Sequence, residues 1–248
     1  MKTGITILVV MVFSITVLLI IAHVLKSQEK YASSGPSSDG GITWHVSNSQ
    51  TEKWTGVSID GLNAVACANG GAIYYSSDGG IKWQVSNSQT ENWTGVSISG
   101  SNAVACIYGG AIYYSSDGGS KWNVVSNTQT ENWFRVSISG SNAVACIYGG
   151  PIYYSRDGGS TWHVSNSQTE NWFRVSISGS NAVACIYGGT IYYSSDGGIT
   201  WHVSNLKFRD WHDVSISGLN AVACETGGAI YYGSISPPTI NSIAPTAV

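Results

Sequence analysis

The octapeptide SSDGGSKW, Ser115 to Trp122, recurs along this chain of 248 residues and decides its fold. The other copies read SSDGGITW from Ser37, SSDGGIKW from Ser76, SRDGGSTW from Ser155 and SSDGGITW from Ser194. Successive copies begin 39 or 40 residues apart. Self-similarity at a fixed period of about 20–50 residues is the signature of a repeat architecture. The chain is therefore expected to repeat one structural unit.

Each unit contains four short runs with strand character, for example residues 93–99, 102–108, 111–116 and 121–127. These runs are rich in β-branched and aromatic residues, and glycine-containing turns separate the first three junctions. No helical periodicity occurs after residue 36. Four short strands in about 40 residues are typical of a β-propeller blade. The extra residue of the 40-residue spacing lies at Val124–Val125, where we expect a β-bulge.

The two ends of the repeat array complement each other. The first unit contains only the octapeptide and a fourth strand, Ile42 to Asn48, whereas the last unit has three strands, from Trp211 to Tyr232, and no octapeptide. Pairing the N-terminal strand with the C-terminal three would complete a fifth blade and remove the exposed strand edges. The predicted fold is all-β, a five-bladed propeller over residues 37–233 with 3+1 strand closure.

The first 25 residues differ from the repeats. Ile5 to Leu25 contains no Asp, Glu, Lys or Arg, and such a helix would cross a hydrocarbon layer of about 30 Å. We interpret residues 1–25 as an N-terminal transmembrane helix, followed by a linker over residues 26–36, with the propeller on the extracytoplasmic side. A cleaved signal peptide and a pilin-type leader cut after Gly4 are the alternatives.

The motif S-x-D-x-G-x-x-W resembles the Asp-box, or BNR repeat, of sialidase-like propellers. The wider pattern G-G-x-I-Y-Y-S-x-D-G-G-x-x-W is most similar to the photosystem II assembly and stability factor family, and the resemblance covers roughly residues 37–233. It implies an Asp-box β-propeller. Asp-boxes occur in enzymes, lectin-like proteins, receptors and assembly factors alike, so the motif implies no single function. The tail, residues 234–248, resembles the opening strand of an IPT-type immunoglobulin-like domain.

The box aspartates are expected to brace turns. A carboxylate in a glycine-rich turn accepts backbone N–H bonds, and the box tryptophan packs beneath the turn. A catalytic acid would be needed once, whereas here five equivalents surround a ring. We therefore predict no catalytic residue among them. The structural residues are Asp39, Asp78, Asp117, Asp157 and Asp196, together with Trp44, Trp83, Trp122, Trp162 and Trp201.

Cysteine recurs at one equivalent site per unit, and histidine follows the box tryptophan in three of the five copies, with Gln84 and Asn123 in the other two, which does not favour a metal or redox site. The cysteines each follow Ala-Val-Ala and are interpreted as small buried residues; the histidines after the box tryptophan are interpreted as surface strand residues. No cofactor and no metal is predicted. The net charge of −3 and the 10% of charged residues do not suit nucleic acid. The cysteines are Cys67, Cys106, Cys146, Cys185 and Cys224, and the histidines are His45, His163 and His202.

The candidate binding face lies opposite the boxes, where loops and irregular positions meet. The third residue of the first strand reads Gly, Gly, Arg, Arg and Asp through the units, and the loop before the last unit reads LKFRD instead of SQTEN. A functional patch is one interpretation; drift of terminal repeats and loops that merely cap blades are the others. The candidate residues are Arg135, Arg174, Lys207, Phe208, Arg209, Asp213, Glu225, Tyr108, Tyr148 and Tyr187.

The predicted function is a membrane-anchored, non-catalytic scaffold that binds a protein or glycan partner, and the family resemblance implies an assembly-factor role. One alternative is a sialidase-like glycoside hydrolase, for which Arg135, Arg174 and Arg209 would supply the substrate-carboxylate site. The Phe-Arg-Ile-Pro element of that family is missing from the sequence, and no non-repeated Tyr–Glu pair stands out. A structural or adhesive surface protein, cellular or viral, is the other alternative.

Overall fold

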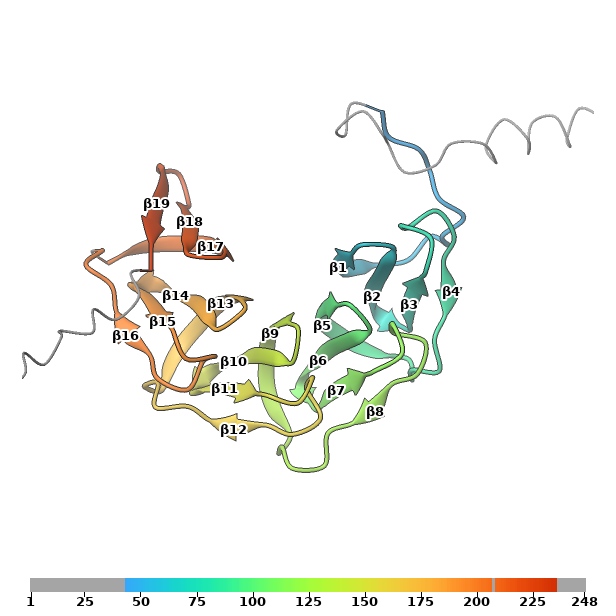
Figure 1. The fold of residues 1–248 in the computed structure, drawn as a ribbon, viewed down its shortest axis with the longest axis horizontal. Coiled ribbons are helices and arrows are strands. Elements are labelled where there is room, and N and C mark those ends of the chain that lie inside the picture. Colours follow the sequence, from blue (N-terminus) through green and yellow to red (C-terminus); the bar gives the residue numbers. More distant parts are fainter. Residues whose placement is uncertain (1–42, 207, 236–248) are drawn as a thin grey trace, which may run out of the picture. The chain divides into compact units, whose positions relative to one another are not determined.

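The computed structural model describes residues 43–206 and 208–235, and the strands are labelled in Figure 1. The chain divides into two units, residues 1–48 and residues 49–248. Nineteen β-strands lie in the second unit. In the described residues no helix occurs, and so none is long and apolar enough to cross a membrane. The predicted anchor, residues 1–25, the linker, residues 26–36, and the tail from residue 236 lie outside the described residues.

Four groups of four strands and one group of three follow each other along the chain, and we call each group a blade. Blade A contains β1 (Trp54–Asp60), β2 (Asn63–Gly71), β3 (Ile73–Ser76) and β4 (Gln84–Val85). Blade B contains β5 (Glu91–Ser99), β6 (Asn102–Gly110), β7 (Ile112–Ser115) and β8 (Asn123–Val124). Blade C contains β9 (Glu131–Ser139), β10 (Asn142–Gly150), β11 (Ile152–Ser155) and β12 (His163–Val164).

Blade D contains β13 (Glu170–Ser178), β14 (Asn181–Gly189), β15 (Ile191–Ser194) and β16 (His202–Val203). Blade E has three strands, β17 (Arg209–Ser217), β18 (Asn220–Glu225) and β19 (Ile230–Ser234). Every blade is an antiparallel meander in which each strand pairs with the next along the chain. The expected all-β, propeller-like architecture is confirmed. Residues 43–48 form no strand, so the five-blade count stays a prediction.

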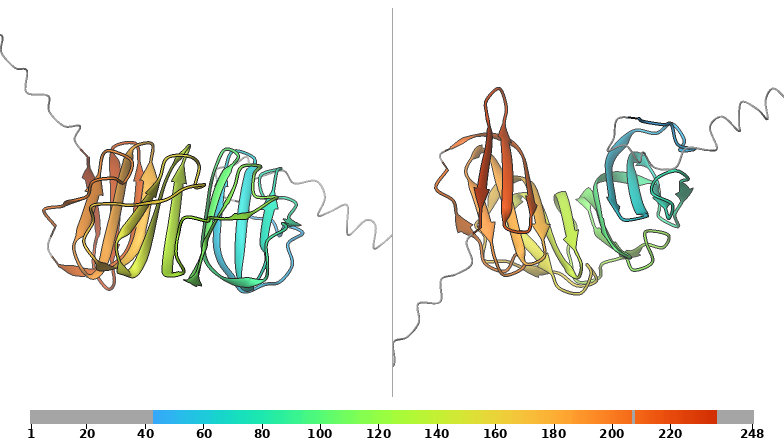
Figure 2. Two further views of the ribbon diagram at one scale, coloured as in Figure 1. Left: turned by 90° about the horizontal axis from the view of Figure 1, so that it is seen from below. Right: turned by 45° about the horizontal axis from the view of Figure 1, so that its top comes forward.

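Consecutive blades are linked by a short antiparallel pairing. The end of the second strand of one blade pairs with the start of the first strand of the next, as in Tyr108 with Asn132 and Gly110 with Glu131. The same pairing joins β2 to β5, β10 to β13 and β14 to β17. Figure 2 shows the strands of successive blades running side by side.

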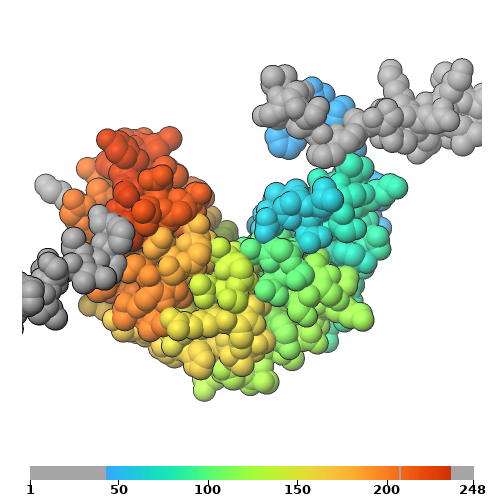
Figure 3. Space-filling model, viewed as in Figure 1, coloured from blue at the N-terminus to red at the C-terminus, as the bar shows by residue number. Residues whose placement is uncertain are grey.

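The core lies between the blades. In blades A to D the second strand buries a continuous apolar segment, and the cysteine of this segment is fully buried. A tryptophan from the first strand of the next blade fills the space, and Trp93, Trp133, Trp172 and Trp211 are each 0% exposed. The blades thus share four apolar clusters, one per junction. Figure 3 shows the side chains of neighbouring blades in contact.

The expected β-bulge at Val124–Val125 is wrong. Strand β8 pairs with β7 without a register shift, and Val125 takes the place that serine has in the other blades, donating its N–H to the carbonyl of Ile112. Asn127 still reaches the next box, because its side chain accepts the N–H of Trp162. The extra residue is therefore accommodated in the exposed loop after the strand, where no ladder bond is lost.

Candidate functional site

The box aspartates bind the backbone of their own turns. In Asp117, Oδ1 accepts the N–H of Lys121 at 2.9 Å and the hydroxyl of Ser115 at 2.9 Å. The same serine accepts the N–H of Gly119 at 3.0 Å. Equivalent bonds are made at Asp78, Asp157 and Asp196, whereas Asp39 lies outside the described residues.

The pKa values of the box carboxyls agree with these hydrogen bonds. In Asp78 the backbone N–H of Lys82 is the main cause that holds the pKa of the carboxyl below its ordinary value. In Asp157 burial acts to raise the pKa, but the hydrogen bonds from Thr161, Ser160 and Ser155 outweigh it and lower the pKa. These carboxyls are ionised and occupied by the turn, so they are poorly suited to donate a proton to a substrate.

The box tryptophans fall into two groups. Trp122, Trp162 and Trp201 are buried against the preceding blade, and each indole N–H donates to the carbonyl of the second box glycine. Trp83 makes the same indole bond to Gly80 but is only partly buried. Trp44 is 87% exposed. The expected packing beneath the turn is therefore observed at three boxes.

A repeated β-bulge shapes the candidate binding face. In the first strand of every blade, the register shifts directly after the strand tryptophan, so that the next residue is unpaired. A bulge of this kind redirects side chains and occurs often near functional sites. The unpaired residues are Thr55, Thr94, Phe134, Phe173 and His212. The bulge therefore gives blades C and D two large side chains in succession, Phe-Arg.

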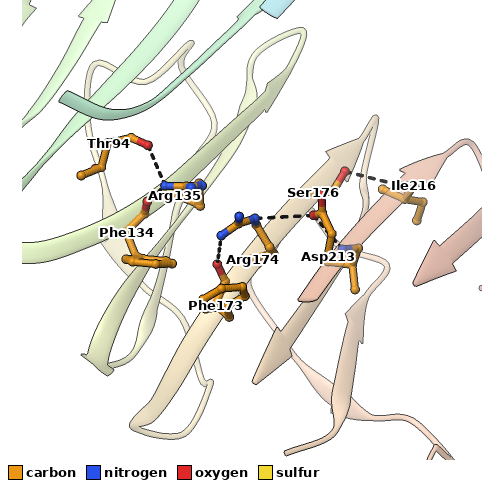
Figure 4. Close-up of polar contacts among 9 residues, drawn as sticks. Thr94, Phe134, Arg135, Phe173, Arg174, Ser176, Asp213 and Ile216 are labelled. Atoms are coloured by element: carbon orange, nitrogen blue, oxygen red, sulfur yellow. Dashed lines mark hydrogen bonds and ion pairs between the residues drawn. The ribbon is translucent and has the colours of Figure 1, made fainter. Parts of the chain in front are cut away.

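Phe134, Arg135, Phe173 and Arg174 form one contiguous group, which we call the arginine–phenylalanine row (Figure 4). The two phenyl rings are 5.3 Å apart between centroids. The Arg174 guanidinium lies 4.5 Å from the Phe173 ring centroid and 5.9 Å from that of Phe134. The Arg135 guanidinium lies 5.0 Å from the Phe134 centroid. Cation–π contacts thus hold both arginines beside the rings.

The two arginines differ in their acidic partners. Arg174 forms an ion pair with Asp213 at 3.6 Å between Nε and Oδ1. Arg135 donates from Nη1 to the carbonyls of Thr94 at 2.6 Å and Phe134 at 2.8 Å, and no carboxylate of the described residues pairs with it. Burial lowers the pKa of Arg135, and the nearby positive charge of Arg174 lowers it further. The row therefore carries an excess positive charge in a partly desolvated place.

Exposed tyrosines flank the row. The Tyr148 ring is 6.4 Å from Phe134, and the Tyr187 ring is 5.8 Å from Phe173, between centroids. Both tyrosines are about half exposed, and so is the equivalent Tyr108. His212 adds a further ring, 5.7 Å from Phe173. The arrangement can bind a ligand that combines a negative charge with apolar or planar groups.

The remaining predicted residues lie apart from the row. Arg209 pairs with Glu225 at 3.0 Å and lies 5.1 Å from the Tyr231 ring centroid. Phe208 is 80% exposed, and Lys207 lies outside the described residues. The three arginines considered for a sialidase-like site therefore have separate partners: Arg135 bonds to backbone carbonyls, Arg174 pairs with Asp213 and Arg209 pairs with Glu225.

Four of the five cysteines are buried, and Cys224 is partly buried. All five thiols are free, and burial raises the pKa of Cys106, Cys146 and Cys185 to about 12, which keeps them protonated. Among the residues that the structure describes, no group of three or more His, Cys, Asp and Glu side chains could hold a metal ion.

Sequence reasoning missed Phe134, Phe173, Thr94 and His212. The repeat alignment did contain a signal, because the dipeptide after the strand tryptophan reads Thr-Gly, Thr-Gly, Phe-Arg, Phe-Arg and His-Asp through the blades. In a regular strand the first would point to the opposite face, and the bulge brings both to one place.

Comparisons with known proteins agree with the repeat. Residues 153–164 and 192–203 match the BNR/Asp-box repeat. The predicted Asp-box repeat is thereby confirmed. No curated protein matches the sequence.

Several solved structures share the fold. One is YCF48 bound to D1 peptide, with a TM-score of 0.57 and 18% identity over 74% of this chain and 65% of that chain. YCF48 from Cyanidioschyzon merolae has a TM-score of 0.56 and 18% identity over 75% of this chain and 69% of that chain. A Niastella koreensis GH74 enzyme has a TM-score of 0.60 and 18% identity over 80% of this chain and 32% of that chain. The similarity is one of fold, since both enzymes and a peptide-binding protein share it.

Proposed function

We propose that this Asp-box protein is a non-catalytic binding module whose arginine–phenylalanine row binds a carboxylate-bearing segment of a protein partner. The observation that carries the proposal is Arg135, a partly buried guanidinium beside a second arginine and without an acidic partner among the described residues. Placing an anion there relieves the repulsion between Arg135 and Arg174 and forms charge-assisted hydrogen bonds.

The aromatic groups favour a peptide as the source of that carboxylate. Phe134 and Phe173 offer apolar surface next to the guanidinium groups, and Tyr148 and Tyr187 extend it with exposed rings. Such a mixture of arginine and aromatic side chains is enriched at the centre of protein interfaces. The structural likeness to YCF48 bound to D1 peptide supports the same class of partner.

Two further parts of the proposal concern the whole chain. A five-bladed ring closed by residues 42–48 would present the row on a rigid face. An N-terminal helix over residues 1–25 would hold the module at a membrane, with the propeller on the extracytoplasmic side. The absence of charged residues from Ile5 to Leu25 supports the anchor.

Peptide binding tests the proposal directly. Fluorescein-labelled peptides would be compared in pairs that differ only in Asp or Glu against Asn or Gln, or in a free against an amidated C-terminus. We expect the carboxylate member of a pair to bind more tightly, and Arg135→Gln or Arg174→Gln to weaken that binding by roughly 10–100-fold. Affinity should also fall with salt.

Arg156→Gln is the matched control, because Arg156 lies in the box of blade C and bonds to the carbonyl of Asp196. Equal binding of the two peptides in each pair, or an equal loss in Arg156→Gln, would contradict the proposal. A glycan array probed with the same proteins covers the other partner class: selective retention on sialylated glycans that Arg135→Gln abolishes would assign the row to sugars.

A further inference from the structure

Asp213 occupies the same register position in blade E that Arg135 and Arg174 occupy in blades C and D. This position follows the bulge of the first strand and pairs with the cysteine of the second strand. The pairs are Arg135 with Cys146, Arg174 with Cys185 and Asp213 with Cys224. The three side chains therefore start from equivalent points of successive blades, and we call them the charged series (Figure 4).

Neighbouring members of the charged series interact. Oδ1 of Asp213 lies 3.6 Å from Nε of Arg174. Arg174 in turn acts on Arg135, because its positive charge adds to the effect of burial in lowering the pKa of Arg135. On the other side, a Cβ on Gly95 of blade B would lie 3.6 Å from Cδ of Arg135. The charged series thus has Arg135 at one end and an acid at the other.

The Asp213 carboxylate is held toward Arg174. Its Oδ1 accepts the N–H of Val214 at 2.9 Å, which fixes the side chain against its own backbone. The Asp213 side chain is 57% exposed, whereas that of Arg174 is 19% exposed. Arg174 also donates from Nη1 to the carbonyl of Phe173 at 3.0 Å. One nitrogen of this guanidinium therefore faces an acid of the chain itself before any ligand arrives.

The charges of the series leave a single positive charge. Arg135 and Arg174 are both cationic, and Asp213 offsets one of them. One ligand carboxylate beside Arg135 would neutralise the remainder. A second negative charge on the same ligand group would lie near the Asp213 carboxylate, and like charges brought together in an interface weaken binding.

We propose that Asp213 is a built-in anion that restricts the arginine–phenylalanine row to a ligand group with a single negative charge. This inference rests on the proposed function, since it concerns the ligand of the same row. Asp213 acts through Arg174 and through its own charge, so it determines specificity without binding the ligand. Side chains with two carboxylates are disfavoured, and so are phosphorylated side chains, which carry a charge of about −1.5 to −2.

A purely structural role of Asp213 makes a different prediction. Asp213→Asn keeps an oxygen that can accept the N–H of Val214 and removes only the charge. If Asp213 merely fixed the backbone after the bulge, this variant would leave ligand selectivity unchanged. Asp213→Glu is the complementary variant, because it keeps the charge and lengthens the side chain.

Three peptides that differ at one central position test the proposal. Each carries the same dye, an amidated C-terminus and a phenylalanine on both sides of glutamine, glutamate or γ-carboxyglutamate, which has two carboxylates on one carbon. Dissociation constants are measured at neutral pH and at one low salt concentration, because salt screens these charges. We expect the wild type to prefer glutamate to glutamine and to bind the γ-carboxyglutamate peptide no more tightly than the glutamate peptide.

The variants isolate the charge of Asp213. In Asp213→Asn the γ-carboxyglutamate peptide should bind about tenfold more tightly than the glutamate peptide, and in Asp213→Glu the wild-type ratio should be kept. Asp210→Asn is the matched control, because it removes an exposed carboxylate from the same strand, β17, that forms no ion pair among the described residues. The ratio in this control should equal that of the wild type.

The same data separate this inference from the function on which it rests. Equal binding of the glutamate and glutamine peptides by the wild type would overturn both. If glutamate is preferred to glutamine, tighter binding of the γ-carboxyglutamate peptide by the wild type would overturn the inference alone. An unchanged ratio in Asp213→Asn, or an equal change in Asp210→Asn, would do the same.

Discussion

At the scale of single residues, each box aspartate acts on its own turn. Asp157 illustrates this, because its carboxylate accepts the N–H and the hydroxyl of Thr161 and the hydroxyl of Ser155. All of these donors lie within four residues of the acid. The brace is therefore local and can be repeated in each blade without any contribution from the neighbours.

The pH dependence of stability follows from this brace. The pKa of Asp157 in the folded chain is held below the unfolded value of about 3.9, so its stabilisation is present above that pH and is lost as the pH falls. We expect Asp157→Asn to lower the melting temperature at neutral pH by a few degrees and to reduce the further loss below about pH 4.

Thermal melts between pH 2 and pH 7 check this expectation. Asp210→Asn is the matched control, because Asp210 is exposed and its carboxylate accepts no hydrogen bond among the described residues. Parallel pH profiles for the wild type and Asp157→Asn would show that the brace contributes nothing.

At the scale of elements, the box is also a packing device between blades. Gly119 has a φ of 91° and lies so close to Val65 that an added methyl group would meet it at 2.4 Å. Gly100 has a φ of 59°, and nothing lies within 4 Å of the corresponding position. The two glycines share a requirement for positive φ but differ in the space that surrounds them.

Alanine substitution separates these two requirements. Gly100→Ala should cost about 1 kcal/mol, which is the strain of a left-handed residue. Gly119→Ala should lower the free energy of unfolding by about 1–3 kcal/mol more than Gly100→Ala does, because its methyl group must also displace Val65. Urea denaturation measures the difference, and equal losses for the two variants would show that the box does not press on the preceding blade.

At the scale of the whole molecule, the blades stabilise each other in sequence order. The N–H of Ile98 donates to Ser58 of the preceding blade, and the same bond joins every later pair of blades. Val96 and Ile98 are buried by these contacts, at 8% and 4% exposure. Stability is then a sum of nearest-neighbour terms, as in other repeat proteins.

Catalysis is tested at this scale, because a sialidase site needs arginines and a nucleophile pair from several blades. In this chain Arg209 is paired with Glu225 on blade E, and Arg174 is paired with Asp213. We expect no hydrolysis of a fluorogenic sialoside above the buffer rate. Hydrolysis by the wild type that Arg174→Ala abolishes would overturn the non-catalytic assignment.

The sequence by itself determined the repeat, the strand content and the turn chemistry, because these depend on residues close together in the chain. The octapeptide predicts its turn wherever it occurs, and the carboxylate–backbone bonds of Asp78, Asp117, Asp157 and Asp196 span at most four residues. Tandem repetition then implied a propeller-like array without further information.

Only the tertiary structure decided which of the residues that differ between repeats contact each other. Arg135 and Arg174 are 39 positions apart in sequence, and they share one row because the blades pack in order and a bulge turns Phe134 and Phe173 toward the same place. Arg209 stands where blades C and D have Glu131 and Glu170, and it pairs with Glu225. A bulge and a side-chain ion pair depend on contacts across strands, and no pattern along one strand contains them.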